Sequence, residues 1–231
     1  MNFHYYGHSA IGCSNNETTI VFDPFFTGNP SVTGGIPADL APATILLTHG
    51  HEDHVGDTET IAKRAGSKVV AVHELSLRLA EMGLDVIGCG LGGRVKHAWG
   101  WSKMVPAFHS SSFEGKYMGM PAGIVVDFGG VRIYNTGDTC VFGDMKLIAE
   151  LYKPEVLILP VGGHYTMDPY EAKKAIELVG PRTVIPVHYN TWPPLEIDVD
   201  AFKKEVESAQ PSVTVHVLKP GAVLELSAGR V

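Results

Sequence analysis

The sequence predicts an α/β protein in which two mixed β-sheets pack face to face and helices cover their outer faces. Short β-type runs recur along the 231 residues and alternate with helix-like segments, most regularly in the second half. Several runs, among them ATILLT and EVLILPV, are continuously apolar, which is typical of strands covered on both faces. Strands mixed with helices over this length favour such a layered arrangement.

The first half of the chain alternates short strands with helix-like segments. Most of its expected strands are bounded by Gly, Pro, Asn or Asp, and they are Phe3–Tyr6, Thr18–Phe22, Thr44–Leu47, Lys68–Val72 and Lys103–Phe108. A helix is expected over Val55–Ala65, directly after a histidine-rich stretch. A second is expected over Glu74–Met82, where apolar residues recur at helical spacing.

The second half repeats this alternation. Its expected strands are Gly123–Phe128, Val131–Asn135, Val156–Leu159, Thr183–Val187 and Val213–Val217. Helices are expected over Phe142–Leu151, over Pro169–Val179, which begins with proline and stops at a glycine, and over the amphipathic Asp200–Ala209. No long linker divides the chain, so we expect one domain spanning residues 1–231.

Composition and charge exclude several classes of protein. Lys and Arg number 18 against 25 Asp and Glu, which gives a net charge of −7 without any run of cations, so we expect no nucleic-acid partner. No apolar run reaches the roughly 18 residues of a membrane span, and MNFHYYGHSA does not resemble a signal peptide. Three cysteines without a C-x-x-C pair are typical of a reduced chain, so we expect a cytoplasmic location and no membrane partner.

A histidine-rich stretch, ILLTHGHEDHVGD at residues 45–57, carries the strongest functional signal. It contains an H-x-H-x-D-H motif made by His49, His51, Asp53 and His54. Residues two apart in extended chain project to the same side, so His49 and His51 can converge on one ion. The adjacent Asp53 and His54 splay apart, which suits a second ion a few Å away. Imidazole and carboxylate are the usual ligands of Zn, Fe and Mn, so the motif favours a metal site over a polar turn.

Three further candidate ligands, His109, Asp138 and His188, each lie just past the C-terminal end of an apolar strand. Taken singly, His109 could be a capping residue, Asp138 a turn residue and His188 a core histidine. Loops and active sites gather at such strand ends, so the shared position favours a single site. With the motif these residues make seven ligands, of which Asp138 can bridge two ions through its two oxygens.

The order and spacing of these residues resemble those of the metallo-β-lactamase fold superfamily over almost the whole chain. YYGHSA, FDPFFTGNP, PVGGHYTMDP and PVHYNTWPP are similar to the UPF0173 metal-dependent hydrolases, close to the ascorbate-6-phosphate lactonase (UlaG-like) branch. The resemblance implies an αββα sandwich with the site along one edge of the two sheets. It also implies a first ion held by His49, His51 and His109, a second held by Asp53, His54 and His188, and Asp138 as the bridge.

Other residues in these motifs are candidates for supporting or catalytic roles. The resemblance places His8 near the metal pocket, although it can equally be a buried histidine bonded to backbone. Asp23 can orient a ligand histidine through the free ring nitrogen, or it can form a turn before proline. His164 follows two glycines past a strand end, so we expect it to contact substrate or to donate a proton, with a loop histidine as the alternative.

The loops beside the candidate ligands supply further expectations. Ser110–Ser112 directly follow His109 and can bond substrate, with Ser110 the main candidate. The residues after the last histidine ligand can form a wall of the pocket; these are Tyr189, Asn190 and Trp192. In the Met- and Trp-rich segment 97–123, we expect Met104 and Phe108 in the core. Met118 and Met120 lie between glycines and are expected to form a flexible flap, and the segment makes self-association of the chain plausible.

The favoured function is a metal-dependent hydrolase in which two divalent ions hold a bridging hydroxide, with Asp53, His8 and His164 as candidate catalytic residues. The lactonase-like branch favours a small lactone or other ester as substrate, and a small phosphodiester is the alternative. We expect zinc as the cofactor, with manganese, iron and nickel as alternatives. The only expected partner besides a second copy is a small-molecule substrate.

Two other functions are less favoured. An iron-dependent oxidoreductase on the same fold tends to replace one histidine of the cluster by a carboxylate, whereas this chain keeps His51 and places Glu52 at a non-ligand position. A protein that uses metal only structurally would be expected to have a closed, thiolate-rich site. The seven ligands contain no cysteine, so a purely structural metal is disfavoured as well.

Overall fold

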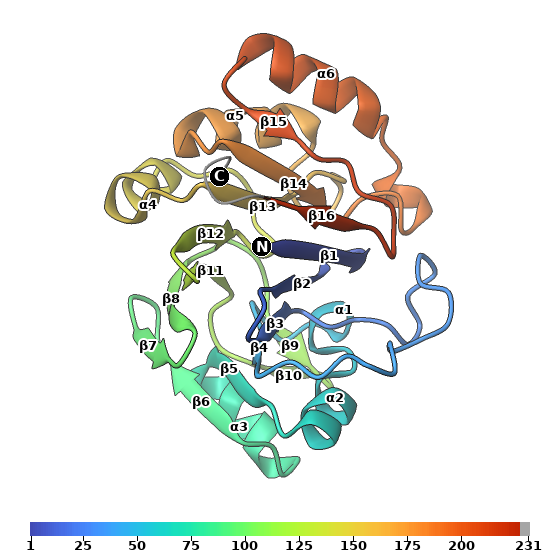
Figure 1. The fold of residues 1–231 in the computed structure, drawn as a ribbon, viewed down its shortest axis with the longest axis vertical. Helices are drawn as coiled ribbons and strands as arrows, with labels where there is room; N and C mark the ends of the chain where they lie inside the picture. The colour runs from blue at the N-terminus through green and yellow to red at the C-terminus, as the bar shows by residue number, and fades with distance from the viewer. Residues whose placement is uncertain (227–231) are drawn as a thin grey trace.

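Two seven-stranded β-sheets lie face to face, with helices on their outer sides (Figure 1). The computed structural model describes residues 1–226. Residues 227–231, the end of the domain expected to span the whole chain, lie outside the described part. The αββα sandwich expected from the sequence is therefore confirmed for the described residues.

The first sheet is antiparallel on one side and parallel on the other. Across the sheet its strands are β16 (Val223–Glu225), β1 (Asn2–Gly7), β2 (Ala10–Ser14), β3 (Thr19–Phe22), β4 (Thr44–Leu46), β5 (Lys68–Val72) and β6 (Val86–Cys89). Neighbours from β16 to β3 run antiparallel, whereas those from β3 to β6 run parallel. The parallel strands end at one edge, which brings the residues that follow them together.

The second sheet is mixed in the same way. Across it lie β15 (Thr214–Val215), β14 (Thr183–Val187), β13 (Val156–Pro160), β12 (Val131–Asn135), β11 (Ala122–Phe128), β8 (Gly100–Pro106) and β7 (Arg94–His97). The strands from β12 to β15 are parallel, and those from β7 to β12 are antiparallel. A separate two-stranded hairpin joins β9 (Ser112–Phe113) to β10 (Lys116–Tyr117).

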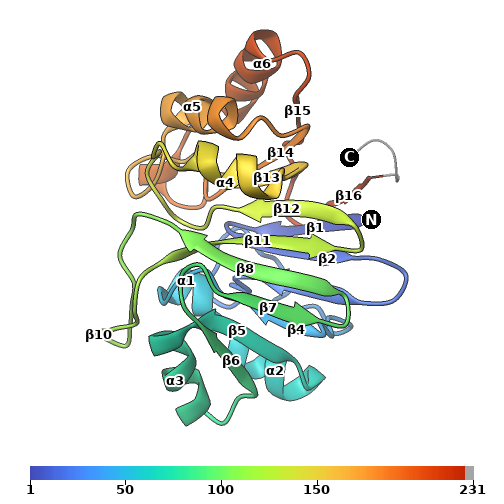
Figure 2. The ribbon, with the colours of Figure 1, turned by 90° about the vertical axis from the view of Figure 1, so that its left-hand side faces the viewer.

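Helices pack on the outer side of each sheet. They are α1 (Glu52–Val55), α2 (Thr58–Ala65), α3 (His73–Glu81), α4 (Met145–Tyr152), α5 (Pro169–Val179) and α6 (Val199–Ala209), with a 3₁₀ turn, η1 (Pro193–Leu195). Figure 2 shows α2 and α3 beside the first sheet and α4, α5 and α6 beside the second. Within residues 1–226, no helix is long and apolar enough to cross a membrane.

The apolar core has two parts. One lies between the sheets and includes Phe22 and Ile45 from the first sheet and Ile124 from the second, all fully buried. The other lies between the second sheet and its helices, where Leu157 of β13 and Phe202 of α6 are buried. Burial of strand residues on both faces explains why β13 and β14 read as continuously apolar runs.

The helix expected over Val55–Ala65 is in fact two helices, α1 and α2, and the prediction of one was wrong. Gly56 separates them with a φ of +42°, a backbone conformation that side chains rarely adopt. A Cβ at this position would lie 2.6 Å from the carbonyl oxygen of Pro24. The close approach of the loop after β3 therefore requires glycine here and interrupts the helix.

Several short strands were not predicted: β2, β6, β7, β16 and the β9–β10 hairpin. The sequence of β2, AIGCS, contains glycine and serine, and glycine in particular is depleted in strands. The edge strand β7, RVKH, has no fully buried side chain and alternates exposed with half-buried residues. Tertiary pairing rather than local preference therefore forms these strands.

The N-terminus of α5 provides a test of local stability. Asp168 caps this helix by accepting a hydrogen bond from the backbone N–H of Glu171 at 2.9 Å. Asp168→Ala leaves that N–H without its partner, so it is expected to lower the free energy of unfolding by about 1 kcal/mol, measured by urea denaturation. Asp168→Asn keeps an acceptor oxygen and should retain most of the stability; equal losses in both variants would contradict the capping role.

Candidate metal centre

The H-x-H-x-D-H motif lies at the turn from β4 into α1. His49 follows the buried strand, and His51 is the N-cap of α1 with extended backbone at φ −89° and ψ 154°. Asp53 and His54 lie in α1 itself. The change from extended chain to helix between the two pairs directs their side chains toward two different groups of donors.

The first group consists of His49, His51 and His109, whose ring nitrogens lie within 4.8 Å of one another. Nε2 of His49 is 2.9 Å from Nδ1 of His51. The ring of His109 lies 5.2 Å from that of His49 and 5.0 Å from that of His51, centroid to centroid. Three imidazole nitrogens from two loops thus lie close together, and they are the three that the resemblance assigns to the first ion.

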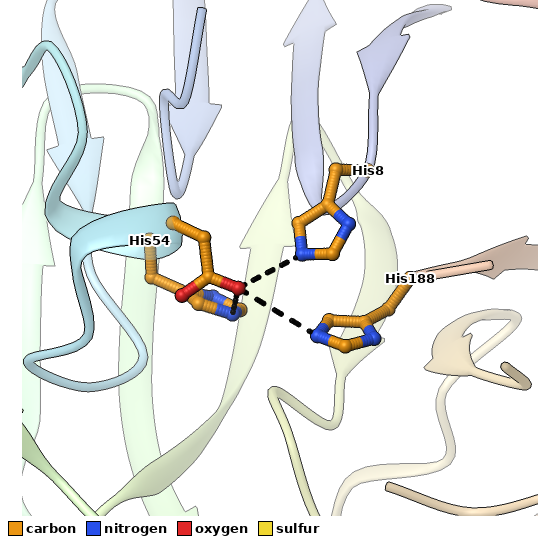
Figure 3. Close-up of side chains that lie close together, drawn as sticks. His8, His54 and His188 are labelled. Carbon is orange, nitrogen blue, oxygen red and sulfur yellow. Dashed lines mark hydrogen bonds and ion pairs between the residues drawn. The ribbon is translucent and has the colours of Figure 1, made fainter. Parts of the chain in front are cut away.

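The second group comprises His8, His54 and His188, which Figure 3 labels around one carboxylate, together with Asp53. Oδ2 of Asp53 is 3.8 Å from Nε2 of His54 and 3.8 Å from Nε2 of His188. Nε2 of His8 is closer still, at 3.0 Å from the same oxygen. The structure therefore adds His8 to the three residues that the resemblance assigned to the second ion.

Asp138 lies between the two groups and is almost fully buried. Its Oδ2 is 3.1 Å from Nε2 of His188 and 3.3 Å from Nε2 of His54. The same oxygen is 3.7 Å from Nε2 of His109, a member of the first group. This carboxylate is therefore the residue through which both groups are joined.

Asp23 supports the motif from behind. It is buried at the end of β3 with a φ of +45°, and its Oδ1 accepts a hydrogen bond from the backbone N–H of Thr48 at 2.9 Å. Its Oδ2 accepts from the Thr48 hydroxyl at 2.7 Å and lies 2.9 Å from Nδ1 of His54. A carboxylate on the far nitrogen fixes the tautomer of His54 and leaves Nε2 directed into the site.

His8 has hydrogen-bond partners on both ring nitrogens. Nδ1 is 2.8 Å from the hydroxyl of Thr191, and Nε2 is 3.0 Å from Oδ2 of Asp53. The consistent arrangement has the Thr191 hydroxyl donating to Nδ1 and Nε2–H donating to the carboxylate. The carbonyl of His8 also accepts from the backbone N–H of His188 at 3.0 Å, so His8 links the end of β1 to the end of β14.

The loop after β8 packs against the motif. Ser110 Oγ lies 3.2 Å from Nε2 of His51, and Ser111 Oγ accepts a hydrogen bond from the backbone N–H of Gly50 at 3.1 Å. Met118 is buried against Gly50, where an added Cβ would lie 2.6 Å from the Met118 Cβ. Ser111 belongs to the run Ser110–Ser112, which is expected from the sequence to bond substrate; in the structure its hydroxyl instead holds the backbone of the motif.

Two expectations for this loop are corrected. Met118 is 3% exposed and belongs to the core between the sheets, so it is not part of a flexible flap, whereas Met120 is exposed. Phe108 is 55% exposed and packs on Phe142, so it is not a core residue, although Met104 is buried as expected. The contact between Met118 and Gly50 holds the loop after β8 against the histidine motif.

Three other predicted residues lie outside the cluster of donors. His164 is exposed, with a φ of +57°, and its ring packs edge-on against Tyr165 at 4.4 Å. Tyr189 is buried among the apolar residues under α5 and α6. The Asn190 side chain holds its own loop, since its Oδ1 accepts from the backbone N–H of Ile197 at 2.8 Å. A catalytic role for His164 stays a prediction.

The buried carboxylates and imidazoles of the site shift one another's pKa values. Burial would raise the pKa of Asp138, but the rings of His188 and His54 outweigh burial and hold it well below its usual range. Burial lowers the pKa of His49 strongly and that of His8 to about 4. Burial also opposes charge on His54, yet the surrounding carboxylates, Asp138 foremost, raise its pKa well above its ordinary value. The site thus concentrates negative charge that calls for a cation.

A cavity of about 330 Å³ opens onto both groups. The residues that line it are His51, Asp53, His109, Ser110, Asp138, Tyr165, His188 and Trp192. Trp192 forms part of the wall as expected, whereas Tyr165 takes the place expected for its neighbour His164. None of the described lining residues is a lysine or an arginine.

The donor set fits divalent metal ions. Six imidazoles, His8 among them, and two carboxylates are ligands that zinc, manganese, iron and nickel accept. Within residues 1–226, Nε2 of His54 is buried without a hydrogen-bond partner while it faces two carboxylate oxygens, Asp138 at 3.3 Å and Asp53 at 3.8 Å. A cation among these atoms would satisfy the orphaned nitrogen and neutralise both oxygens.

Comparison with known proteins agrees with this chemistry. The β-lactamase superfamily domain matches residues 2–188. A UPF0173 metal-dependent hydrolase of Thermus thermophilus is 46% identical over 226 residues, covering 96% of this chain and 97% of that protein. The chain belongs to the UPF0173 metal-dependent hydrolases. A second member, from Pyrococcus furiosus, is 49% identical over 226 residues, covering 95% of this chain and 97% of that one.

A solved structure supports the same assignment of this UPF0173 hydrolase. Igni18, a metallo hydrolase from the hyperthermophilic archaeon Ignicoccus hospitalis, superposes with a TM-score of 0.89 at 36% sequence identity. The alignment covers 98% of this chain and 99% of that one. The fold and the general class, a metal-dependent hydrolase, are therefore shared along nearly the full length.

Substitution of Asp23 tests whether the carboxylate that contacts His54 contributes to metal binding at the UPF0173 site. Asp23→Asn removes the charge that orients His54, so zinc affinity is expected to fall about 10- to 100-fold, measured by competition with a chromophoric chelator. The exposed Asp39 offers a matched control, and Asp39→Asn should leave the affinity unchanged. An Asp23→Asn protein with wild-type zinc affinity would contradict the orienting role.

Thr191 tests whether His8 depends on its outer hydrogen bond. Thr191→Val keeps the shape of the side chain but leaves Nδ1 of His8 buried without a donor, so the free energy of unfolding is expected to fall by about 1–3 kcal/mol. Thr58 is a matched control, because its buried hydroxyl has no hydrogen-bond partner, and Thr58→Val should cost less than about 0.5 kcal/mol. Similar losses in the two variants, measured by urea denaturation, would refute the pairing.

Proposed function

We propose that this UPF0173 hydrolase uses two divalent ions, one in each group of donors, to hydrolyse a small lactone or carboxylic ester. The observation that carries the proposal is the position of Asp138, whose Oδ2 lies within 3.7 Å of ring nitrogens from both groups. A site for a single ion would not need a buried carboxylate between the two groups of donors. Zinc suits a set of donors in which imidazoles predominate.

The residues that would hold the ions follow from the convergence of their atoms. His49, His51 and His109 would hold the first, and Asp53, His54 and His188 the second, with Asp138 shared. When bound, such ions lower the pKa of water to about 7 and polarise the carbonyl of the substrate. The chain itself supplies the fixed geometry, because Asp23 and His8 hold His54 and Asp53 in place.

Asp53 is the carboxylate best placed to act on water. Its side chain is 25% exposed and lines the cavity, whereas that of Asp138 is 4% exposed. Burial would raise the pKa of Asp53, but His54 and the hydrogen bond from His8 outweigh burial and hold it well below its usual range. The ionised carboxylate can accept a hydrogen bond from the attacking water and orient it toward a substrate in the cavity.

The lining of the cavity favours a neutral carbonyl substrate over a phosphodiester. A phosphodiester carries a negative charge, and enzymes that bind one commonly pair it with arginine or lysine. The described lining contains two carboxylates and no arginine or lysine. At about 330 Å³, the cavity is at the small end of the range for small-molecule sites, which agrees with a small lactone or ester.

Asp53→Ala tests the two-ion proposal. Loss of this carboxylate should reduce bound zinc from two ions per chain to one and lower hydrolysis by at least about 100-fold, because the second ion no longer activates water or substrate. Metal content is measured by plasma mass spectrometry, and activity on parallel panels of lactones, thioesters and phosphodiesters with defined added metals. Glu52→Ala, at the exposed neighbouring position, is the control and should retain both ions. Full activity in Asp53→Ala would refute the proposal, and turnover confined to phosphodiesters would reassign the substrate.

A further inference from the structure

We infer that the substrate carries an apolar substituent, which lies against Tyr165 and Trp192 while the scissile carbonyl faces the donors. The inference rests on the proposed function, because it takes the ester or lactone group to be held at the metal centre. These two rings are the only aromatic side chains among the described residues that line the cavity, apart from the histidines. These two rings therefore form the surface that the non-reacting part of a bound substrate contacts.

Trp192 is a rigid wall of the cavity. Its ring is half-buried and lies edge-on to the ring of His8 at 4.8 Å and near that of Phe25 at 6.2 Å. The loop that carries it is closed by a backbone hydrogen bond from Leu195 N–H to the Trp192 carbonyl at 2.8 Å. A preformed aromatic surface loses little conformational entropy when a ligand covers it.

Tyr165 presents an apolar surface to water. It is 59% exposed, and it lies on a tight turn in which its backbone N–H donates to the carbonyl of Gly163 at 2.6 Å. The turn is tied to the metal centre, because Met167 N–H donates to the carbonyl of Thr139, the residue after the shared carboxylate, at 3.2 Å. Exposed large apolar side chains beside a site are a common mark of ligand binding.

The neighbouring loop extends this apolar character. The backbone N–H of Phe108 donates to the hydroxyl of Thr139 at 3.0 Å, and the exposed Phe108 ring packs against Phe142 at 5.0 Å. The rings of Phe108 and Phe142 therefore lie beside the residues that follow Asp138 in the chain. A charged substituent would find no arginine or lysine in the described lining, whereas an alkyl or aryl group would remove apolar surface from water.

Alkyl hydroxamates of increasing chain length test the inference without knowledge of the natural substrate. Their hydroxamate group binds zinc, and their alkyl chain probes the wall. Acetohydroxamate, butyrohydroxamate and hexanohydroxamate are titrated into the zinc-loaded protein by calorimetry. Affinity should rise about threefold per methylene, close to the roughly fourfold that full burial of a methylene produces.

Tyr165→Ser should reduce this dependence on chain length while leaving the affinity for acetohydroxamate nearly unchanged. Tyr170→Ser is the matched control, because Tyr170 is an exposed tyrosine on α5 that does not line the cavity. Affinity that is independent of chain length, or an equal effect of both variants, would overturn the inference. Sedimentation velocity adds a second criterion, since a dimer that is broken by Tyr165→Ser would assign the ring to a subunit contact instead.

The outcomes separate this inference from the proposed function. Zinc-dependent binding with no effect of chain length refutes the apolar substituent and leaves the metal centre intact. Hydroxamate binding that is the same with and without zinc refutes the two-ion site, and the inference fails with it. Zinc-dependent binding that strengthens with chain length and weakens in Tyr165→Ser supports both.

Discussion

The Asp138 carboxylate is the feature on which the rest of the site depends, because it is almost fully buried and faces imidazole rings instead of water. A buried charge is costly unless it is paired. Three histidines, from the motif, from the loop after β8 and from the end of β14, direct ring nitrogens at its Oδ2 within 3.7 Å. A bound cation among these atoms would compensate the charge of this carboxylate and that of Asp53 together. The requirement for metal therefore follows from burial as much as from ligand identity.

The fold assembles the donors for a metal by bringing the ends of several strands together. The backbone is strained where these strand ends meet. His8, Asp23 and His188 all have positive φ angles, at 54°, 45° and 55°. Each lies at the end of a strand; His8 and His188 turn their side chains toward Asp53, and Asp23 turns its carboxylate toward Nδ1 of His54. Strained residues of this kind persist only when the surrounding structure over-determines them. Here the hydrogen bonds of His8 with Thr191, of Asp23 with Thr48, and of the His188 N–H with the His8 carbonyl supply that constraint.

Much of the fold could be predicted from local pattern. The bounds expected for Lys68–Val72, Val131–Asn135, Pro169–Val179 and Thr183–Val187 are those observed, because strong apolar runs with clear stop signals define them. Strands such as β2 and β7 could not be found in this way, since their sequences are weakly apolar and their pairing is tertiary. The helix break at Gly56 depends on contact with Pro24, which lies 32 residues away and leaves no local signal.

In the site, too, some residues could be predicted from local sequence and others could not. Its candidate ligands could be predicted because each follows an apolar strand, and the structure brings all seven together. Residues that act through hydrogen bonds were harder to find. Thr191 is an ordinary loop residue until the chain places it beside His8. His164 was favoured because it follows two glycines past a strand end, yet it is the neighbouring Tyr165 that lines the cavity.

The central claim is that Asp138 lies between two metal ions. A crystal structure of the zinc-loaded protein, with anomalous differences collected on both sides of the zinc absorption edge, tests it most directly. We expect two zinc peaks per chain, one among His49, His51 and His109 and one among Asp53, His54 and His188, with Asp138 in contact with both. A single peak at full zinc loading, or two peaks with Asp138 bound to neither, would contradict it.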